Sequence, residues 1–172
     1  MTETPELSRT PVTGDLDAFI ALHHRRLLGL LTLKTGSRVE AEDLAQDALI
    51  KLVTHWHEVS EMANPWGWLA TVAVNSSSSS WRRKIRGRAA TARLAAIGRP
   101  QQDVAGAVEM LSVVQTLPTR QREALILRFY AQLSVRDTAQ AMGCAEGTVK
   151  SLTHNAIGQL RTQLQEEIDD ED

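Results

Sequence analysis

The sequence predicts an all-α protein of two small helical domains joined by a flexible linker. Apolar residues recur at the three- and four-residue spacing of a helix on both sides of a central stretch that lacks this pattern. Alanine and leucine are abundant, whereas the 172 residues include only 10 Gly and 5 Pro, which favours helix. We therefore expect one domain at residues 15–86, a linker at 87–106 and a second domain at 107–165.

The first domain should begin with two helices. Residues 1–14 show neither helical periodicity nor a signal-peptide pattern, so we expect a disordered lead. A first helix is predicted over 16–33, and Gly36 interrupts the pattern before a second helix at about 39–57. The second helix should bury one stripe, made of Ala45, Ala48, Leu49, Leu52, Val53 and Trp56.

A third helix should begin near Trp66, after Pro65, and continue through five serines, Ser76–Ser80. A serine run would suit a flexible spacer, but the apolar face of Leu69, Val72 and Ala73 keeps its phase into the serines. Five serines cost a helix about 2 kcal/mol relative to alanine, which tertiary packing can offset. We therefore expect these serines to be helical.

Charge is arranged in blocks along the chain, although the net charge is only −2. Residues 76–102 hold seven Lys or Arg and no acid, whereas six of the seven residues in 166–172 are acidic. Such blocks indicate partners of different sign, unless the basic block is only a solvated surface. The acidic tail is either a solvated end or a shield for the basic block. A linker of about 20 residues, fully extended, reaches roughly 70 Å, the length of on the order of 20 base pairs of duplex.

The second domain contains the signature of a helix-turn-helix. Ser134 and Asp137 form a capping box, Gly143 ends a short helix, and another helix opens at about Glu146. One face of this last helix should be buried through Val149, Leu152, Thr153, Ala156 and Leu160. The opposite face carries small or hydrogen-bonding residues: Gly147, Lys150, Ser151, His154, Asn155 and Gly158. Such a face can enter the major groove, where Lys150 can bond a phosphate or guanine and Asn155 can pair with adenine.

Two features of the first domain permit more than one interpretation. Ile50 lies among the polar residues Asp43, Gln46, Asp47 and Thr54 of the second helix, as in a protein-docking patch, although a lone exposed isoleucine is also ordinary. The four tryptophans, Trp56, Trp66, Trp68 and Trp81, fall within a short stretch. They are either core residues or, beside the basic block, a platform for unstacked single-stranded bases.

Other classes of protein receive little support. No phosphate loop, nucleophile motif, paired carboxylates or metal-ligand spacing is present, so neither enzyme activity nor a cofactor is expected. Cys144 is the single cysteine, which indicates a reducing compartment, the cytoplasm, and we interpret it as a packing residue. No window of about 18 apolar residues predicts a membrane span.

Three stretches, "AEDLAQDALIKLVTHW", "NPWGWLATVAVN" and "LPTRQREALILRFYAQLSVRDTAQAMGCAEGTVKS", resemble bacterial RNA polymerase sigma factors of the extracytoplasmic-function type, in the actinobacterial branch of sigma-70 group 4. The resemblance covers about residues 15–165. It implies that 15–86 is a sigma-2 domain and 107–165 a sigma-4 domain. It also implies that the chain binds core RNA polymerase, directs it to promoters and assists melting of the −10 element, with an anti-sigma factor as a possible further partner.

The resemblance implies three sets of site residues. The polymerase clamp would be bound by Asp43, Gln46, Asp47 and Ile50. The unpaired −10 strand would be held by Asn64, Trp66, Asn75, Ser78, Ser79, Arg82, Arg83, Lys84 and Arg86. The −35 duplex would be read by Arg136, Gly147, Thr148, Lys150, Ser151, His154 and Asn155, and the linker would follow the RNA exit path.

The chain departs from the family pattern at two places. Asn155 stands where the family usually has arginine, which suggests weak or adenine-biased reading of the −35 element, and the serine run replaces larger residues beside the −10 strand. Two other functions compete with this interpretation. One is a free-standing helix-turn-helix regulator that binds duplex DNA, and the other is an adaptor protein without a role on DNA.

Overall fold

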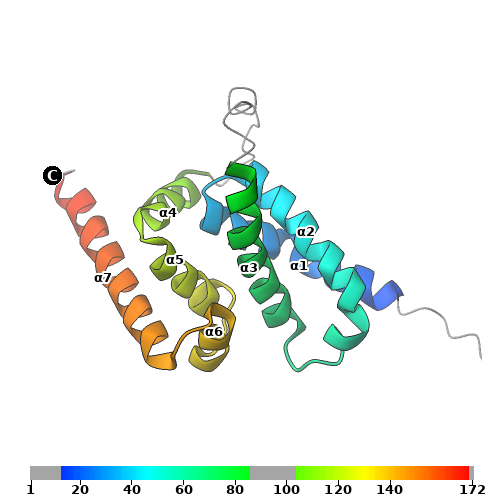
Figure 1. Cartoon of the computed structure of the whole chain (residues 1–172). Helices are drawn as coiled ribbons and strands as arrows, with labels where there is room; N and C mark the ends of the chain where they lie inside the picture. Colours follow the sequence, from blue (N-terminus) through cyan, green and yellow to red (C-terminus); the bar gives the residue numbers. More distant parts are fainter. Residues whose placement is uncertain (1–12, 86–103, 171–172) are drawn as a thin grey trace, which may run out of the picture.

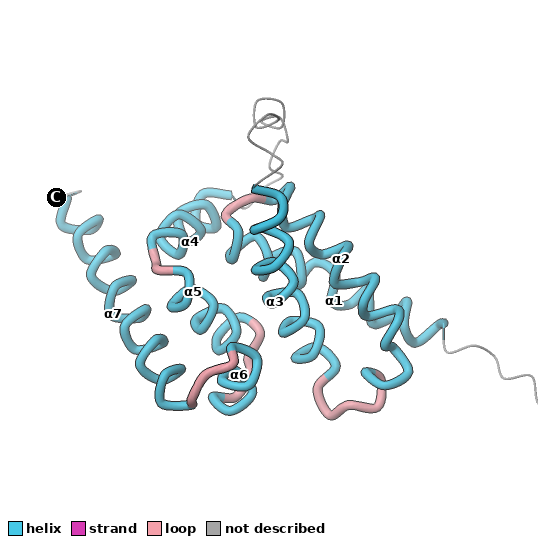
Figure 2. The backbone as a smooth tube through the Cα atoms, in the orientation of Figure 1, coloured by secondary structure: helices cyan, strands magenta, loops and turns pink. Residues whose placement is uncertain are grey.

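The computed structural model describes residues 13–85 and 104–170, and every regular element in these two ranges is helical (Figures 1 and 2). The N-terminal unit consists of α1 (Thr13–Thr35), α2 (Arg38–Val59) and α3 (Pro65–Ile85). The C-terminal unit consists of α4 (Val104–Thr116), α5 (Thr119–Leu125), the π-helical turn η1 (Ile126–Tyr130), α6 (Val135–Met142) and α7 (Glu146–Asp170). The all-α prediction is confirmed. Most of the expected lead and linker, with Arg86, lies outside the described residues.

Local sequence explains the connections within the N-terminal unit. Gly36 ends α1 with φ +74°, and the hydroxyl of Ser37 accepts a hydrogen bond from the backbone N–H of Glu40 to cap α2. At the start of α3, the side-chain oxygen of Asn64 accepts a 2.9 Å hydrogen bond from the N–H of Gly67, and Pro65 occupies the first helical position. The helix α3 then runs to Ile85, so the serine run is helical as predicted.

The core of the N-terminal unit corrects one prediction. Ala45, Ala48, Leu52 and Trp56 are buried on α2 as expected, but Val53 is 55% exposed. The buried stripe of α2 also includes Ala41, Leu44 and Val59. These residues move the centre of the stripe away from Val53, which lies roughly 120° around the helix from that centre. Val53 therefore adjoins the exposed Ile50 rather than the core.

The C-terminal unit contains the predicted helix-turn-helix. The Ser134 hydroxyl accepts a 3.0 Å hydrogen bond from the N–H of Asp137, and Gly143 has the left-handed φ of +60° that ends α6. Three features differ from expectation: α4 begins at Val104, α5 ends in the π-helical turn η1, and α7 continues through the acidic tail to Asp170.

The two units pack against each other instead of lying apart. Leu27, Leu31 and Leu69 of the N-terminal unit belong to the same cluster of buried residues as Leu127 and Leu133 of the C-terminal unit. Figures 1 and 2 show α3 running beside α5 and α6, with α7 on the outer side of the C-terminal unit. The sequence did not predict this packing. The packing determines which candidate site residues are exposed to solvent.

Candidate nucleic-acid and protein interfaces

The face of α7 that was predicted to read duplex DNA is open to solvent. All six predicted residues on this helix are exposed: Gly147, Thr148, Lys150, Ser151, His154 and Asn155. Arg136, the seventh predicted residue, is exposed on α6. On the opposite side of α7, Val149 and Ala156 are fully buried against the rest of the unit. The capping box and Gly143 thus place a helix with one anchored face and one free polar face at the surface, the arrangement that major-groove reading requires.

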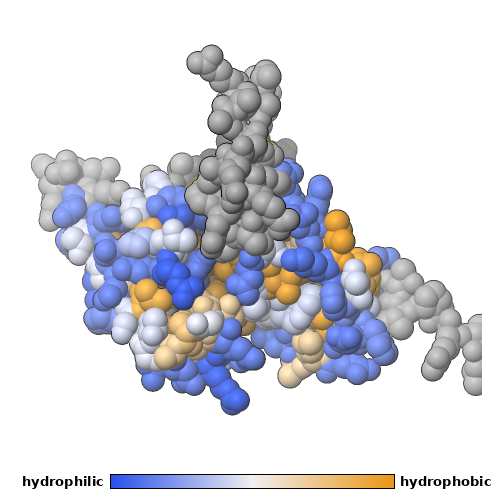
Figure 3. Space-filling model, viewed as in Figure 1, coloured by the Kyte–Doolittle hydropathy of each residue, from blue (hydrophilic) through white to orange (hydrophobic). Residues whose placement is uncertain are grey.

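The outward face of α2, opposite its buried stripe, carries exposed apolar side chains edged by polar groups. We call this exposed surface the α2 stripe, and it consists of Val39, Asp43, Gln46, Asp47, Ile50 and Val53. Its apolar members are 47%, 65% and 55% exposed at Val39, Ile50 and Val53. Gln46 and Asp47 are exposed and Asp43 is half-buried. Apolar surface interrupts the hydrophilic surface of the N-terminal unit in Figure 3. The stripe is larger than predicted because Val39 and Val53 extend the patch around Ile50.

The residues predicted to hold the −10 strand differ in their exposure to solvent and in their hydrogen bonds. Asn64 is exposed at the start of α3, and its side chain caps that helix. Asn75 is also exposed, but its amide donates a 3.2 Å hydrogen bond to the carbonyl of Ala141 in α6. Trp66 is only 6% exposed. The structure gives the backbone of α3 through Ser78, Ser79, Arg82, Arg83 and Lys84, but their side chains lie outside its description.

Trp66 lies at the boundary between the two units. Its indole Nε1 donates a 3.1 Å hydrogen bond to the carbonyl of Ala131, and the Arg26 guanidinium lies 4.4 Å from the ring centroid. The ring of His23 stacks on the indole at 5.2 Å between centroids. Burial, together with the charge of Arg26, lowers the pKa of His23 below its usual value. In this arrangement Trp66 offers no face to an unstacked base.

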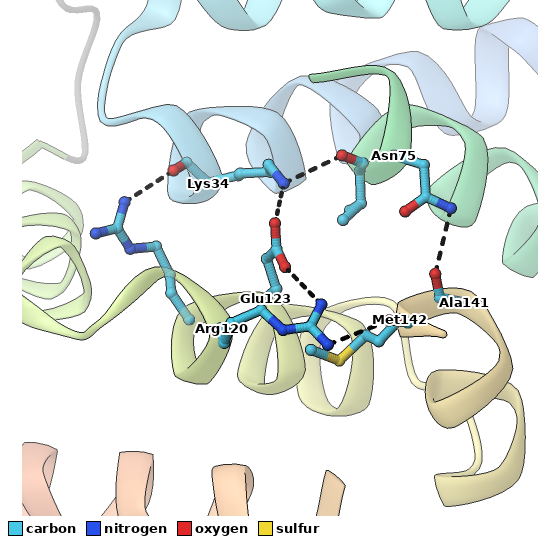
Figure 4. A network of polar contacts seen from close by, with 8 residues as sticks. Lys34, Asn75, Arg120, Glu123, Ala141 and Met142 are labelled. Atoms are coloured by element: carbon cyan, nitrogen blue, oxygen red, sulfur yellow. Dashed lines mark hydrogen bonds and ion pairs between the residues drawn. The ribbon is translucent and has the colours of Figure 1, made fainter. Parts of the chain in front are cut away.

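A buried ion pair also joins the two units. Lys34 Nζ lies 2.5 Å from Glu123 Oε1, and each side chain is 9% exposed. Lys34 also donates to the carbonyl of Val74, and Arg120 approaches the other carboxylate oxygen of Glu123 at 3.6 Å (Figure 4). Burial lowers the pKa of Lys34, which the hydrogen bond to Glu123 opposes. The pKa of Arg122 is lowered as well, again chiefly by burial.

Sequence reasoning missed the residues of this boundary. Arg26, Lys34 and Glu123 belong to no motif, and the contacts that they make across the boundary, Arg26 with Tyr130 and Lys34 with Glu123, join residues 104 and 89 positions apart. One signal was available for Glu123, which precedes Leu127 by one helical turn and so falls on a buried face. A charged residue on the buried face of a helix indicates that another residue pairs with it, but the sequence does not show which residue that is.

Metal and membrane features are also informative. Within the described ranges no group of His, Cys, Asp and Glu side chains is arranged to hold a metal ion. None of the helices there combines the length and apolar character needed to cross a bilayer. Cys144 is half-buried in the turn between α6 and α7, where it packs against the core.

Comparison with known proteins identifies both units. The family model for sigma-70 region 2 matches residues 19–87, and the model for sigma-70 region 4 matches residues 107–160. The ECF RNA polymerase sigma factor SigL of Mycobacterium tuberculosis is 34% identical over 140 residues, covering 77% of this chain and 78% of SigL. The RNA polymerase sigma-E factor of Streptomyces coelicolor is 30% identical over 133 residues, covering 73% of this chain and 72% of that protein.

Solved structures agree with this family. The sigma factor RpoE of Bartonella quintana, solved in complex with the anti-sigma factor NepR, superposes with a TM-score of 0.73 at 27% identity, covering 88% of this chain and 97% of RpoE. CnrH, solved with the cytosolic domain of CnrY, shares the fold at a TM-score of 0.59 and 18% identity. The fold and the two matched regions define an RNA polymerase sigma factor of the sigma-70 class. Within that class, the chain belongs to the extracytoplasmic-function (ECF) sigma factors.

Proposed function

We propose that this sigma factor docks on core RNA polymerase through the α2 stripe, holds the unpaired −10 strand on α3 and reads the −35 duplex with α7. The observation that carries the proposal is the α2 stripe itself. Its three apolar side chains are about half exposed or more, although the same helix buries a complete apolar stripe on its other side. The bond-forming chemistry of transcription belongs to the polymerase in this scheme, and the chain contributes binding alone. We place this work in the cytoplasm, with the polymerase.

Docking through α2 agrees with the chemistry of protein interfaces. An apolar centre excludes water when it is covered, and a polar rim gives the contact its orientation. Ile50 and Val53 supply the centre, whereas Gln46 and Asp47 lie at the rim. The acidic residues favour a basic partner surface, because complementary charge speeds encounter and fixes the register.

The −10 strand would lie along α3 and the residues that follow it. Asn64 and Asn75 are amides that can bond the edge of an unpaired base, and Trp66 offers an aromatic face once it is uncovered. The cations Arg82, Arg83, Lys84 and Arg86 would meet phosphates. Short serine side chains in the same helix would let the backbone approach the strand closely.

The −35 element would be read by the exposed face of α7. Lys150 is the cation at its centre, and Asn155 lies on the same face as His154 and Ser151. Asn155 replaces a second cation, so phosphate attraction is low and reading at adenine is favoured. An anti-sigma factor is a further proposed partner, supported by the complex with the anti-sigma factor NepR in which RpoE was solved.

The docking proposal is tested by polymerase association. Ile50→Asp and Asp47→Lys should each weaken association of the full chain with core polymerase by about tenfold or more, because a central apolar contact or a rim charge is lost. Glu166→Lys is the matched control, since it changes an exposed carboxylate on α7 in the same way. Association unchanged by Ile50→Asp would contradict docking through the α2 stripe.

The promoter proposal is tested by run-off transcription from genomic fragments with purified core polymerase. Lys150→Ala and Asn155→Ala should lower transcription from the same promoters, whereas Gln165→Ala, also exposed on α7, should not. A sigma factor should bind duplex DNA weakly when the polymerase is absent. Tight, sequence-specific duplex binding by the chain alone would instead indicate a free-standing regulator.

A further inference from the structure

Two side chains of α2 lie along the edge of α3 where its serine run begins. Figures 1 and 2 show α3 between α2 on one side and α5 and α6 on the other. On the α2 side, Lys51 contacts Ser76 and His55 contacts Trp68. We call these four residues the α2–α3 edge. None of them was predicted to hold the −10 strand, although α3 is the helix proposed to carry it.

The ammonium group of Lys51 is held against the first serine of the run. Lys51 Nζ donates a 2.5 Å hydrogen bond to Ser76 Oγ, and Ser76 is only 6% exposed whereas Lys51 is exposed. An ammonium group has three N–H donors. Within residues 13–85 and 104–170 no other group accepts from this ammonium, so two of its donors remain available to an anion.

A lysine held in this way is prepared to bind a phosphate. A free lysine side chain loses rotamer freedom when it binds, whereas Lys51 has already lost much of that freedom through its bond to Ser76. Alanine at position 76 would suit the buried position equally well but would accept no hydrogen bond. Ser76 therefore acts as a positioning residue for the Lys51 charge.

The rings of His55 and Trp68 form the other end of the edge. Their centroids are 5.8 Å apart and their planes are tilted by 44°. His55 Nδ1 donates a 2.9 Å hydrogen bond to the carbonyl of Lys51, which orients the imidazole on α2. Trp68 packs partly against the core and is half-buried, whereas Trp66 is only 6% exposed. Of these two tryptophans, Trp68 is therefore the one that offers part of its ring to solvent.

The spacing of the two ends fits a short unpaired strand. Trp68 and Ser76 are eight residues apart on α3, which is about 12 Å along the helix axis. Three or four stacked nucleotides, at about 3.4 Å each, cover that distance. A single strand presents both a phosphate and an open base face, whereas a duplex hides the faces of its bases. Asp47, one turn before Lys51, repels phosphates and so favours a path on the α3 side.

We infer that α2 contributes to the binding of the −10 strand: Lys51, positioned by Ser76, binds a phosphate, and the rings of His55 and Trp68 receive a base. The inference rests on the proposed function for the role of α3. It adds a cation and a stacking surface from the side of α3 that faces α2, next to the α2 stripe proposed for the polymerase.

The phosphate contact is tested by the salt dependence of strand binding. The probe is a fluorescein-labelled random-sequence DNA strand of about 12 nucleotides, and its fluorescence anisotropy with the full chain is measured over a series of salt concentrations. Lys51→Met keeps most of the side-chain stem and removes the charge. The slope of the logarithm of affinity against the logarithm of salt concentration should become less steep by about 0.7, the value for one phosphate of a single strand. Arg25→Met removes an exposed cation of α1 and should leave the slope unchanged.

The base contact is tested with a second probe, a strand of the same length whose sugars carry no bases. At a salt concentration that suppresses phosphate-only binding, the unsubstituted chain should bind the intact strand about tenfold more tightly than the abasic strand. Trp68→Leu should remove most of this preference. His55→Ala, at an exposed position where folding is not at risk, should reduce it severalfold.

The positioning role of Ser76 is tested by a double-mutant cycle. Ser76→Ala should weaken strand binding about threefold in the unsubstituted chain and should have no effect in Lys51→Met, because a positioning residue acts only through the group that it positions. An equal loss in both backgrounds contradicts that role.

Two results overturn the inference. One is a salt slope that Lys51→Met leaves unchanged, and the other is a preference for the intact strand that persists in both Trp68→Leu and His55→Ala. Failure of the proposed function would appear separately, as polymerase association insensitive to Ile50→Asp.

Discussion

Lys34 and Glu123 form a buried ion pair, with Nζ and Oε1 2.5 Å apart, although 89 residues separate them in the chain. Neither side chain is more than 9% exposed, so the attraction between the charges has to offset the loss of their hydration. The pair joins α1 of the N-terminal unit to α5 of the C-terminal unit.

Substitution of one partner should be far more costly than substitution of both. Lys34→Met leaves Glu123 buried without its nearest cation, and we expect the free energy of unfolding to fall by about 3 kcal/mol. The double variant Lys34→Met with Glu123→Met replaces the pair by apolar groups and should lie within about 1 kcal/mol of the unsubstituted chain. Urea denaturation of Lys34→Met, Glu123→Met and the double variant measures the coupling, and additive losses would show that the two charges do not depend on each other.

Val53 and Leu52 should respond very differently to truncation although they are adjacent. Leu52 is fully buried whereas Val53 is 55% exposed, so Leu52→Ala should lower the unfolding free energy by about 3 kcal/mol and Val53→Ala by less than about 0.5 kcal/mol. Val53→Ala should nevertheless weaken association with core polymerase. If Val53→Ala associates normally with core polymerase, Val53 is not part of the docking surface and Ile50 remains its centre.

Acidification should destabilise the cluster around Trp66. Burial and Arg26 lower the pKa of His23 below its usual 6.5, so the unfolded chain binds a proton more readily than the folded chain. The contribution of neutral His23 is complete above pH 6.5 and is lost as pH falls from 6.5 through the lowered pKa. His23→Phe keeps a ring against Trp66 and removes the titration. Its unfolding free energy should therefore depend less on pH between about 7.5 and 5.5, and parallel curves for the two proteins would exclude His23 as the cause.

The capping box should set the stability of the reading helix. Ser134→Ala removes the oxygen that accepts from Asp137 N–H and should lower the unfolding free energy by about 1 kcal/mol. Ser134→Thr keeps a hydroxyl at this position and should retain most of that stability. A thermal-denaturation midpoint that is the same for Ala and Ser at this position would show that the cap contributes nothing to the unit.

The helix α2 shows how much of the fold the spacing of apolar residues can predict. The spacing of apolar residues located the helix to within two residues and identified Ala45, Ala48, Leu52 and Trp56 as buried. It placed Val53 wrongly. Whether a residue at the edge of an apolar stripe is buried depends on the neighbours that pack against it, and the spacing of residues along one helix does not show which neighbours those are. The outward polar face of α7 was predicted correctly, since the capping box and Gly143 fix the phase of the turn locally.

Trp66 shows what the local sequence pattern could not predict. Residues two apart lie about 200° apart around a helix, so Trp66 and Trp68 cannot both face the core, but this spacing does not indicate which of them is buried, or against what. The answer is the carbonyl of Ala131, 65 residues away, at the end of a π-helical turn that no local pattern predicted.

The sequence by itself determined the all-α class, the three helices of the N-terminal unit, the capping box and glycine stop of the helix-turn-helix, and the family, because hydrogen bonds between residues four apart and apolar spacing are properties of short segments. Only the tertiary structure decided that the units close on each other, that Trp66 and Asn75 face the second unit and that Lys34 meets Glu123. These contacts join residues more than 60 positions apart, and the unpaired carbonyls at helix ends accept any donor that packing brings to them.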